Sequence, residues 1–178
     1  MIENLIKVMT PPEHPLATGS KDDWAVVEKT IGTILPDDYK EYISIYGIGR
    51  IGDFLWALNP FYVEGSANLM ETMEYFQDSY IEFKRDFPED FLKEVFPKDN
   101  SLLLWGMTDN GDFLYWAYDS NQNPNNWKVG ITNMRDDEEY IFNMNMSTFL
   151  EKLVKAEIQT NAFPEDWLKI KNKPFRKL

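Results

Sequence analysis

The strongest constraint on the fold is the segment LPDDYKEYISIYG at residues 35–47, which predicts a helix with a defined start and end. Pro36 has the fixed φ angle of a first helical position, and the aspartates after it suit the positive end of the helix dipole. Gly47 ends the helix as a left-handed cap. Apolar residues recur at i, i+3, i+4 and i+7, which predicts one buried face made of Tyr39, Tyr42, Ile43 and Tyr46.

The rest of the chain alternates between helix and strand patterns. Ser20 begins a helix with Asp23 as its capping-box acid. A helix over residues 68–87 ends before Pro88, and a last core helix covers residues 147–157. Strands are predicted at residues 53–58, 102–108, 112–118, 127–133 and 139–143, and a short docked helix is predicted after residue 161.

The clearest hairpin surrounds Asn110 and Gly111, because both residues of an Asn-Gly pair accept a positive φ angle. With these two as the turn, Asp109 faces Asp112 and Trp105 faces Trp116. One face of the hairpin then carries Leu103, Trp105, Met107, Leu114, Trp116 and Tyr118.

Composition limits the kind of partner. The 178 residues include 18 basic and 30 acidic side chains, a net charge of −12. Five of the basic residues fall in the last ten positions, so 13 basic and 30 acidic residues leave residues 1–168 with a net charge of −17. An acidic body argues against nucleic acid as a partner and favours either a basic protein partner or simple solubility. No apolar run long enough to cross a membrane, no secretory signal and no cysteine occur, so we expect a cytoplasmic protein without a membrane partner.

Motifs for chemistry are weak. The glycines of GIGRIG at residues 47–52 follow a helix and precede a strand, which reverses the order that a dinucleotide site needs. His14 is the single histidine and lies in a proline-rich loop. Carboxylates are plentiful, so a carboxylate hydrolase remains an alternative. We expect no catalytic, cofactor-binding or metal-binding residue, and hence no enzyme.

The best functional signal is a row of acids on the predicted helix at residues 68–87. They recur every three or four residues, opposite the apolar stripe, and we call them the acidic ridge: Glu71, Glu74, Asp78, Glu82 and Asp86. Like charges four residues apart destabilise a helix by about 0.2–0.5 kcal/mol per pair. A solvated helix face is the commoner explanation, and a contact surface for a basic partner is the alternative.

A second acidic cluster falls in a predicted hairpin tip. It consists of Asp136, Asp137, Glu138 and Glu139. A solvent-exposed turn explains it most simply, and a further partner contact is the other hypothesis.

An ordered set of motifs resembles the SUKH superfamily, which contains fungal cell-wall-synthesis regulators and bacterial toxin-immunity proteins. The matching motifs are ILPDDY at 34–39, YGIG at 46–49, GDFL at 52–55, NP at 59–60, WGMTDNGD at 105–112, YW at 115–116 and STFL at 147–150. The resemblance implies an α+β fold in which one mostly antiparallel sheet packs against several helices.

The resemblance also implies a domain organisation and a function. It covers residues 20–157, which leaves residues 1–19 as an entry loop and residues 158–178 as an extension with a basic tail. It implies an immunity protein that binds and neutralises a cognate toxin, often a nuclease, by protein–protein contact. Together with the acidic body, it favours a basic nuclease domain as that toxin. A non-catalytic regulatory or scaffold module of the same fold is the alternative.

Overall fold

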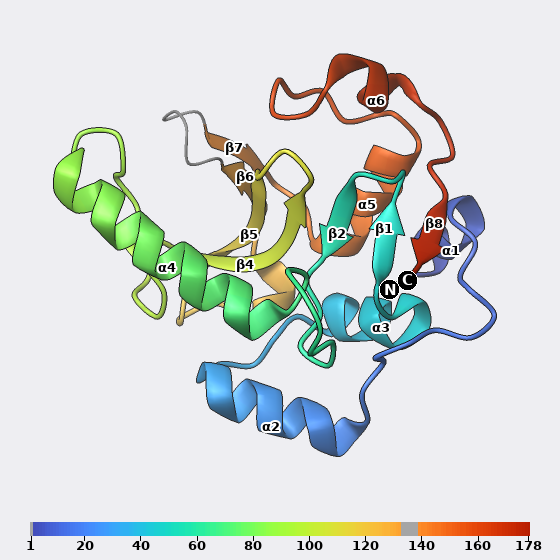
Figure 1. Cartoon of the computed structure of the whole chain (residues 1–178), viewed down its shortest axis with the longest axis horizontal. Coiled ribbons are helices and arrows are strands. Elements are labelled where there is room, and N and C mark those ends of the chain that lie inside the picture. The colour runs from blue at the N-terminus through green and yellow to red at the C-terminus, as the bar shows by residue number, and fades with distance from the viewer. Residues whose placement is uncertain (1, 133–138) are drawn as a thin grey trace.

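The computed structural model describes residues 2–132 and 139–178, which form helices packed on one sheet (Figure 1). The helices are α1 (Glu3–Val8), α2 (Lys21–Ile31), α3 (Asp37–Tyr46), α4 (Leu69–Asp86), the 3-10 turn η1 (Pro124–Asn126), α5 (Met146–Val154) and α6 (Glu165–Lys169). The strands are β1 (Gly49–Ile51), β2 (Leu55–Ala57), β3 (Glu94–Val95), β4 (Ser101–Thr108), β5 (Phe113–Tyr118), β6 (Val129–Thr132), β7 (Glu139–Phe142) and β8 (Phe175–Lys177).

The strands join in the order β7-β6-β5-β4-β2-β1-β8, and every neighbouring pair along this path is antiparallel. Strand β3 lies off the path and pairs in parallel with the start of β4. The expected α+β fold with a single mostly antiparallel sheet is therefore confirmed.

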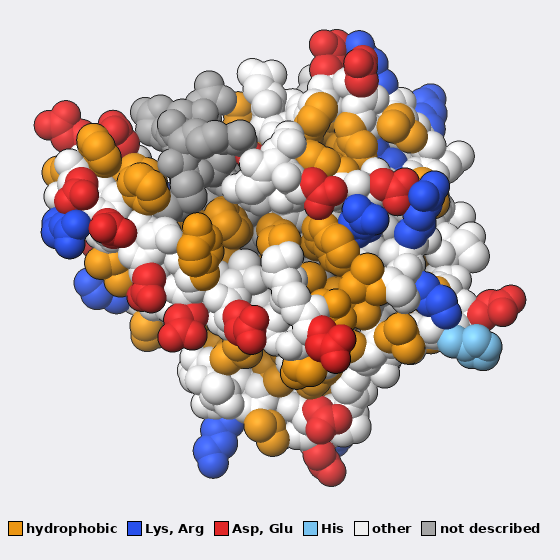
Figure 2. All heavy atoms as spheres, viewed as in Figure 1, with side chains coloured by type: hydrophobic (Ala, Val, Ile, Leu, Met, Phe, Trp, Pro, Cys, Tyr) orange, Lys and Arg blue, Asp and Glu red, His pale blue; other side chains and the backbone are white. Residues whose placement is uncertain are grey.

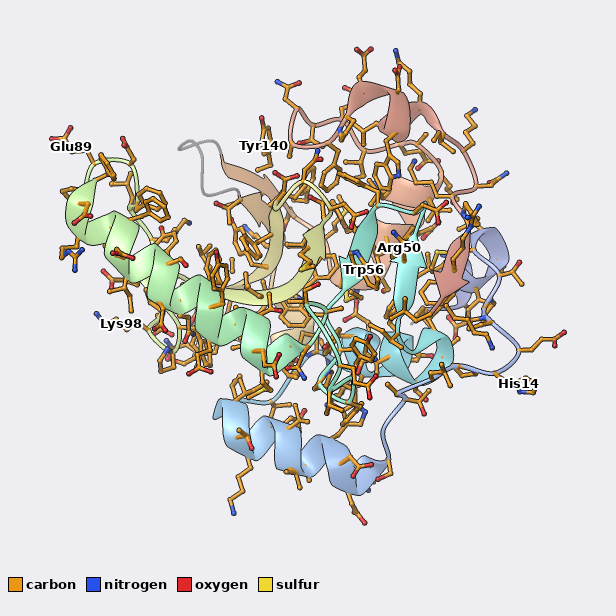
Figure 3. The ribbon with its side chains drawn as sticks, in the orientation of Figure 1. His14, Arg50, Trp56, Glu89, Lys98 and Tyr140 are labelled. Carbon is orange, nitrogen blue, oxygen red and sulfur yellow. The ribbon has the colours of Figure 1, made fainter. Side chains whose placement is uncertain are left out.

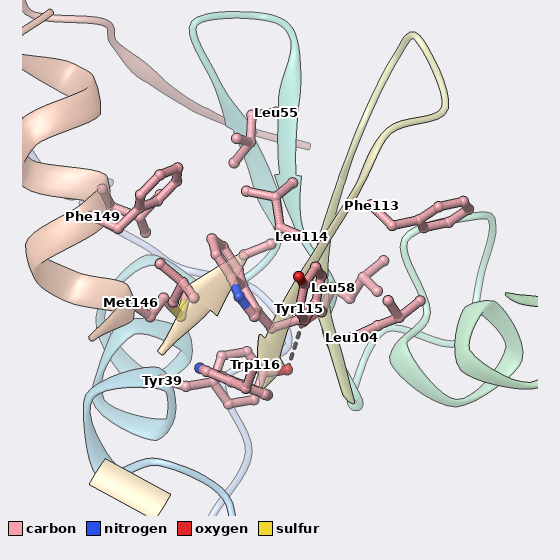
Figure 4. Packing of buried hydrophobic residues seen from close by; sticks show 14 of the residues in the cluster. Tyr39, Leu55, Leu58, Leu104, Phe113, Leu114, Tyr115, Trp116, Met146 and Phe149 are labelled. Atoms are coloured by element: carbon pink, nitrogen blue, oxygen red, sulfur yellow. Dashed lines mark hydrogen bonds between the residues drawn. The ribbon is translucent and has the colours of Figure 1, made fainter. Parts of the chain in front are cut away.

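Helices cover both faces of the sheet at its centre, as Figure 4 shows for the residues around β5. On one face the ring of Trp116 lies 5.1 Å from that of Tyr39 on α3. On the other face the ring of Phe113 lies 4.8 Å from that of Phe76 on α4. Edge-on aromatic contacts of this kind stabilise the core beyond the burial of their area.

The LPDDY motif connects α3 to three other parts of the chain. Asp37 and Asn125 exchange two hydrogen bonds of 2.7 and 2.9 Å, which attach η1 to the start of α3. The buried carboxylate of Asp38 accepts a 2.8 Å hydrogen bond from the Ser147 amide in the first turn of α5. Burial raises the pKa of Asp38, because the effect of burial exceeds the lowering effect of hydrogen bonding to Ser147. The Tyr39 hydroxyl donates a 2.6 Å bond to the Leu58 carbonyl.

The hairpin differs from its prediction in both turn and register. Gly111 has a φ of 83°. The Thr108 amide donates a hydrogen bond to the Asp112 carbonyl and the Thr108 carbonyl accepts one from the Gly111 amide, so the loop has three residues instead of two. A β-bulge at Trp105 shifts the pairing, so Trp116 faces Leu103. Beyond the bulge Met107 faces Phe113 and lies on the opposite face of the sheet from Leu114. The predicted Trp105–Trp116 pairing is therefore wrong.

Both predicted terminal segments contain regular structure. Residues 1–19 were expected as an entry loop, but α1 forms within them because Leu5 is buried against α5 and Tyr46 donates a hydrogen bond to the Met9 carbonyl. The extension at residues 158–178 contains the expected docked helix, α6. It also adds β8, which pairs with β1 and becomes an edge of the sheet.

A buried lysine attaches the extension to the core. Lys173 is fully buried, and its ammonium donates hydrogen bonds of 2.6, 3.0 and 3.2 Å to three carbonyls, those of Ile170, Leu153 and Leu168. It also lies 4.6 Å from the centre of the Trp167 ring. Burial lowers the pKa of Lys173 to about 8, because the charged form loses its hydration.

This lowered pKa predicts a pH dependence of stability. Between pH of about 8 and 10.5 the unfolded chain binds a proton that the folded chain has released, so Lys173 makes the free energy of unfolding rise with pH. We expect the difference between wild type and Lys173→Met to move by about 2 kcal/mol in favour of wild type from pH 7 to pH 10. Urea unfolding of both proteins measures it. If the difference in unfolding free energy does not change with pH, the three carbonyls and the Trp167 ring keep the ammonium charged in the folded chain.

Candidate functional site

The acidic ridge lies on α4 as predicted from the sequence. All five of its side chains are exposed, while the opposite side of the helix buries Leu69, Met73, Phe76 and Tyr80. Asn68 caps the helix by accepting a 3.0 Å hydrogen bond from the Glu71 amide. In Figure 2 acidic side chains follow α4 across the visible face.

Charge along the ridge is compensated at one end. Arg85 lies 3.7 Å from Glu82 and 2.9 Å from Asp86, and its hydrogen bond with Asp86 raises the pKa of the guanidinium. Among the residues that the structure describes, no ion pair involves Glu71, Glu74 or Asp78. The uncompensated negative charge is therefore concentrated in the first half of α4.

A large aromatic residue lies within this uncompensated part of the ridge. Tyr75 is 68% exposed and stands four residues after Glu71 and three before Asp78, so the three side chains are neighbours on the helix surface. Beside it α4 and the sheet enclose a shallow hollow of about 250 Å³, which we call the α4 groove. The groove is mostly apolar and is lined by Ser66, Glu71, Thr72, Tyr75, Met107 and Phe113.

The floor of the α4 groove continues along the sheet. A row of residues that are direct partners on neighbouring strands crosses the sheet, and their side chains point to the face that α4 covers. The row consists of Arg50, Trp56, Met107, Phe113 and Thr132. Away from α4 this row is only partly buried. Figure 3 shows Arg50 and Trp56 on the adjacent strands β1 and β2.

Polar contacts orient the indole ring of Trp56, one member of this row. The Trp56 indole nitrogen donates a 2.8 Å hydrogen bond to Asp109. The Arg50 guanidinium lies 5.2 Å from the centre of the Trp56 ring and 3.7 Å from the Asp109 carboxylate. Asp109, predicted as part of a tight turn, thus also positions an aromatic side chain on this face.

The second acidic cluster is described only at its end. Asp136, Asp137 and Glu138 lie outside the described residues. Glu139 is the first residue of β7 and pairs with Thr132 on β6. Its backbone therefore lies at the Thr132 end of the row of cross-strand partners that begins at Arg50.

The remaining candidate catalytic and metal-binding residues form no recognisable site within the described residues. His14 is exposed in the loop before α2 (Figure 3), and no group of three or more possible metal ligands occurs within residues 2–132 and 139–178. The glycines of the GIGRIG segment have a packing role. Gly47 and Gly49 permit close backbone approach, because a Cβ atom at Gly49 would lie 2.4 Å from the Arg176 carbonyl. Among the described helices, none has both the length and the apolar character to span a membrane.

Comparison with known proteins identifies the family. The model of the SUKH_6 family, described as SMI1-KNR4 cell-wall, matches residues 21–150. The chain belongs to the SUKH_6 family. A search of curated proteins and a search of solved structures return no match.

The SUKH_6 match extends from α2 into α5 and so includes α4, the acidic ridge and the α4 groove. Helix α6 and strand β8 lie outside the match but pack on its residues: the Trp167 indole donates a 2.8 Å hydrogen bond to the Gly52 carbonyl. This SUKH_6 domain therefore has a terminal extension that belongs to the same folded unit.

Tyr75 and Met107 were not among the contact residues predicted for this SUKH_6 domain from the sequence. Tyr75 could have been found, because its spacing from Glu71 and Asp78 places it on the ridge side of the helix. Met107 could not have been found, because the bulge at Trp105 decides to which face of the sheet its side chain points.

Proposed function

We propose that this SUKH_6 chain is an immunity protein, which binds a bacterial toxin domain and blocks it by covering its active surface. The observation that carries the proposal is the exposed acidic ridge, with its first half uncompensated by neighbouring cations. The proposed partner is a basic nuclease domain, because proteins that bind nucleic acid carry clusters of lysine and arginine. The proposal includes no chemical step and places the chain in the cytoplasm.

The acidic ridge supplies what a nuclease surface binds. Acids three or four residues apart on a helix stand about 4.5–6 Å apart along its axis, so the ridge presents a linear series of negative charges as a phosphate backbone does. Complementary charge accelerates association and makes it sensitive to salt. The partner's phosphate-binding side chains would then be occupied and its substrate excluded.

The family description, SMI1-KNR4 cell-wall, favours a second candidate, a regulatory or scaffold module without a toxin partner. The two candidates differ in the number of partners and in the neighbouring gene. An immunity protein has one tight partner encoded beside it, whereas a scaffold has several partners encoded elsewhere.

Co-expression tests the proposal. The toxin domain encoded by the adjacent gene is induced in cells with and without this chain. We expect growth to continue only when the chain is present. Cell death in the presence of folded chain, confirmed by its thermal unfolding transition, would contradict the proposal.

Charge reversal on the ridge gives a quantitative prediction. Replacing Glu74, Asp78 and Glu82 by lysine should lower the association rate with that toxin domain by about tenfold or more at low salt, because steering contributes factors of about 10–1000. Stopped-flow mixing at two salt concentrations measures the rate. The control variant reverses three exposed acids outside α4, namely Glu13, Asp22 and Glu157, which changes the net charge equally. Equal loss in both variants would assign the effect to overall charge and not to the ridge.

A further inference from the structure

We infer that the α4 groove is a docking site for a partner segment that presents one apolar side chain between basic residues. This inference rests on the proposed function only in taking the partner to be a protein. It names the place of contact and the chemistry of the segment that fits there.

The size of the α4 groove suits a side chain better than a metabolite. Its volume of about 250 Å³ lies below the range of about 300–1000 Å³ of small-molecule pockets. Its floor, Met107 and Phe113, is apolar and is fixed by the sheet and by the contact of Phe113 with Phe76 on α4. A hollow of this kind accepts one leucine-sized or phenylalanine-sized side chain.

The residue types around the groove are those that contribute most at protein interfaces. Tyrosine, tryptophan, methionine and arginine are enriched there, and tyrosine and tryptophan often carry the binding energy. Here Tyr75 is 68% exposed at the rim, Met107 is in the floor, and Trp56 is held beside it by its hydrogen bond to Asp109. A single exposed tyrosine needs no explanation, but one beside a hollow and within an acidic row indicates a contact site.

The negative charge beside the α4 groove determines which partner segment can bind there. Glu71 lines the groove, and Glu71 and Asp78 flank Tyr75 on the same surface of α4 without an ion pair among the described residues. An apolar side chain entering the groove would bring its sequence neighbours close to these two carboxylates. Lysine or arginine at those neighbouring positions would be attracted, and acidic residues would be repelled.

Short peptides test the groove without the toxin. The probes are KKLKK, KKSKK and EELEE, titrated into isotope-labelled full-length chain and followed by NMR. We expect KKLKK to shift the Met107 methyl signal and the amides of residues 71–78, with binding at least about fivefold tighter than that of the other two peptides. Equal binding of KKLKK and KKSKK, or shifts centred elsewhere on the molecule, would overturn the inference.

Two substitutions on α4 provide a matched comparison. Tyr75→Ala should weaken KKLKK by about tenfold, whereas Ile81→Ala, which removes a side chain 53% exposed on another side of the helix, should change nothing. Both positions are exposed, so both variants should fold. A dimer of wild type that Tyr75→Ala abolishes in sedimentation would assign the groove to a second copy and contradict the inference.

The toxin domain separates the two proposals. If it binds wild type and Tyr75→Ala equally, the function stands and the groove is the wrong site. If KKLKK binds the groove but the toxin domain does not bind the chain, the groove stands and the proposed function fails.

Discussion

Tyr39→Ala is expected to lower the free energy of unfolding by about 4 kcal/mol, close to the cost of removing any fully buried aromatic side chain. Tyr39 has no exposed surface, and its ring lies 5.7 Å from that of Trp24 and 5.1 Å from that of Trp116. The substitution leaves a cavity between α2, α3 and β5. It also removes the donor to the Leu58 carbonyl. Together these losses should lower the midpoint of thermal unfolding by about 10 °C in a chain of this length.

Two further variants separate the contributions to this loss. Tyr39→Phe keeps the ring and removes the hydroxyl, so it should cost about 1–2 kcal/mol. Tyr75→Ala makes the same change as Tyr39→Ala at a position 68% exposed and should stay within about 0.5 kcal/mol of wild type. Urea unfolding measures all three. A loss below about 1 kcal/mol in Tyr39→Ala would contradict the role of the LPDDY motif as a core connection.

Deleting residues 163–178 is expected to be the most damaging change to the chain. It removes three buried apolar side chains, Phe163, Trp167 and Leu168, each of which stabilises the fold by about 1.5–3 kcal/mol. It also removes β8 and Lys173, which exposes the edge of β1 and leaves the Leu153 carbonyl without the lysine. The loss should approach the whole stability of a domain, about 5–15 kcal/mol.

The expected result of the deletion is loss of the cooperative thermal transition or of soluble protein. The control replaces Lys169 and Lys171 by serine, which removes tail charge at exposed positions and should leave the transition nearly unchanged. A truncated chain that unfolds at the temperature of the full chain would show that residues 163–178 are an appendage, as the boundary at residue 157 predicted from the sequence implies.

Local signals predicted the longer helices of this fold well, whereas α1 lies in a segment expected as a loop. Asn68 and Phe87 are the cap residues of α4, and Ser20 and Asp23 form the expected capping box of α2. These elements depend on residues a few positions apart, so the sequence contains the information. The exposure of the acidic ridge follows from the same helical spacing.

Features that depend on distant residues were not predicted. The bulge at Trp105 and the three-residue loop change which side of the sheet Met107 occupies, although the Asn-Gly pair favours a two-residue turn. Here Asp109 accepts a hydrogen bond from Trp56, 53 residues earlier in the chain. The short strand β8 has β1 as its partner in the sheet, and the two lie more than 120 residues apart in the sequence. The α4 groove could therefore be recognised only in the structure.

The most direct test of the account is a titration of toxin activity with purified proteins. The proposed partner, a nuclease domain that we expect the adjacent gene to encode, is assayed on nucleic acid while this chain is added. We expect activity to fall to zero at one chain per toxin domain, and reversal of Glu74, Asp78 and Glu82 to slow this loss of activity by about tenfold or more at low salt. Full nuclease activity in an excess of the folded wild-type chain would contradict the claim that this SUKH_6 domain neutralises a toxin.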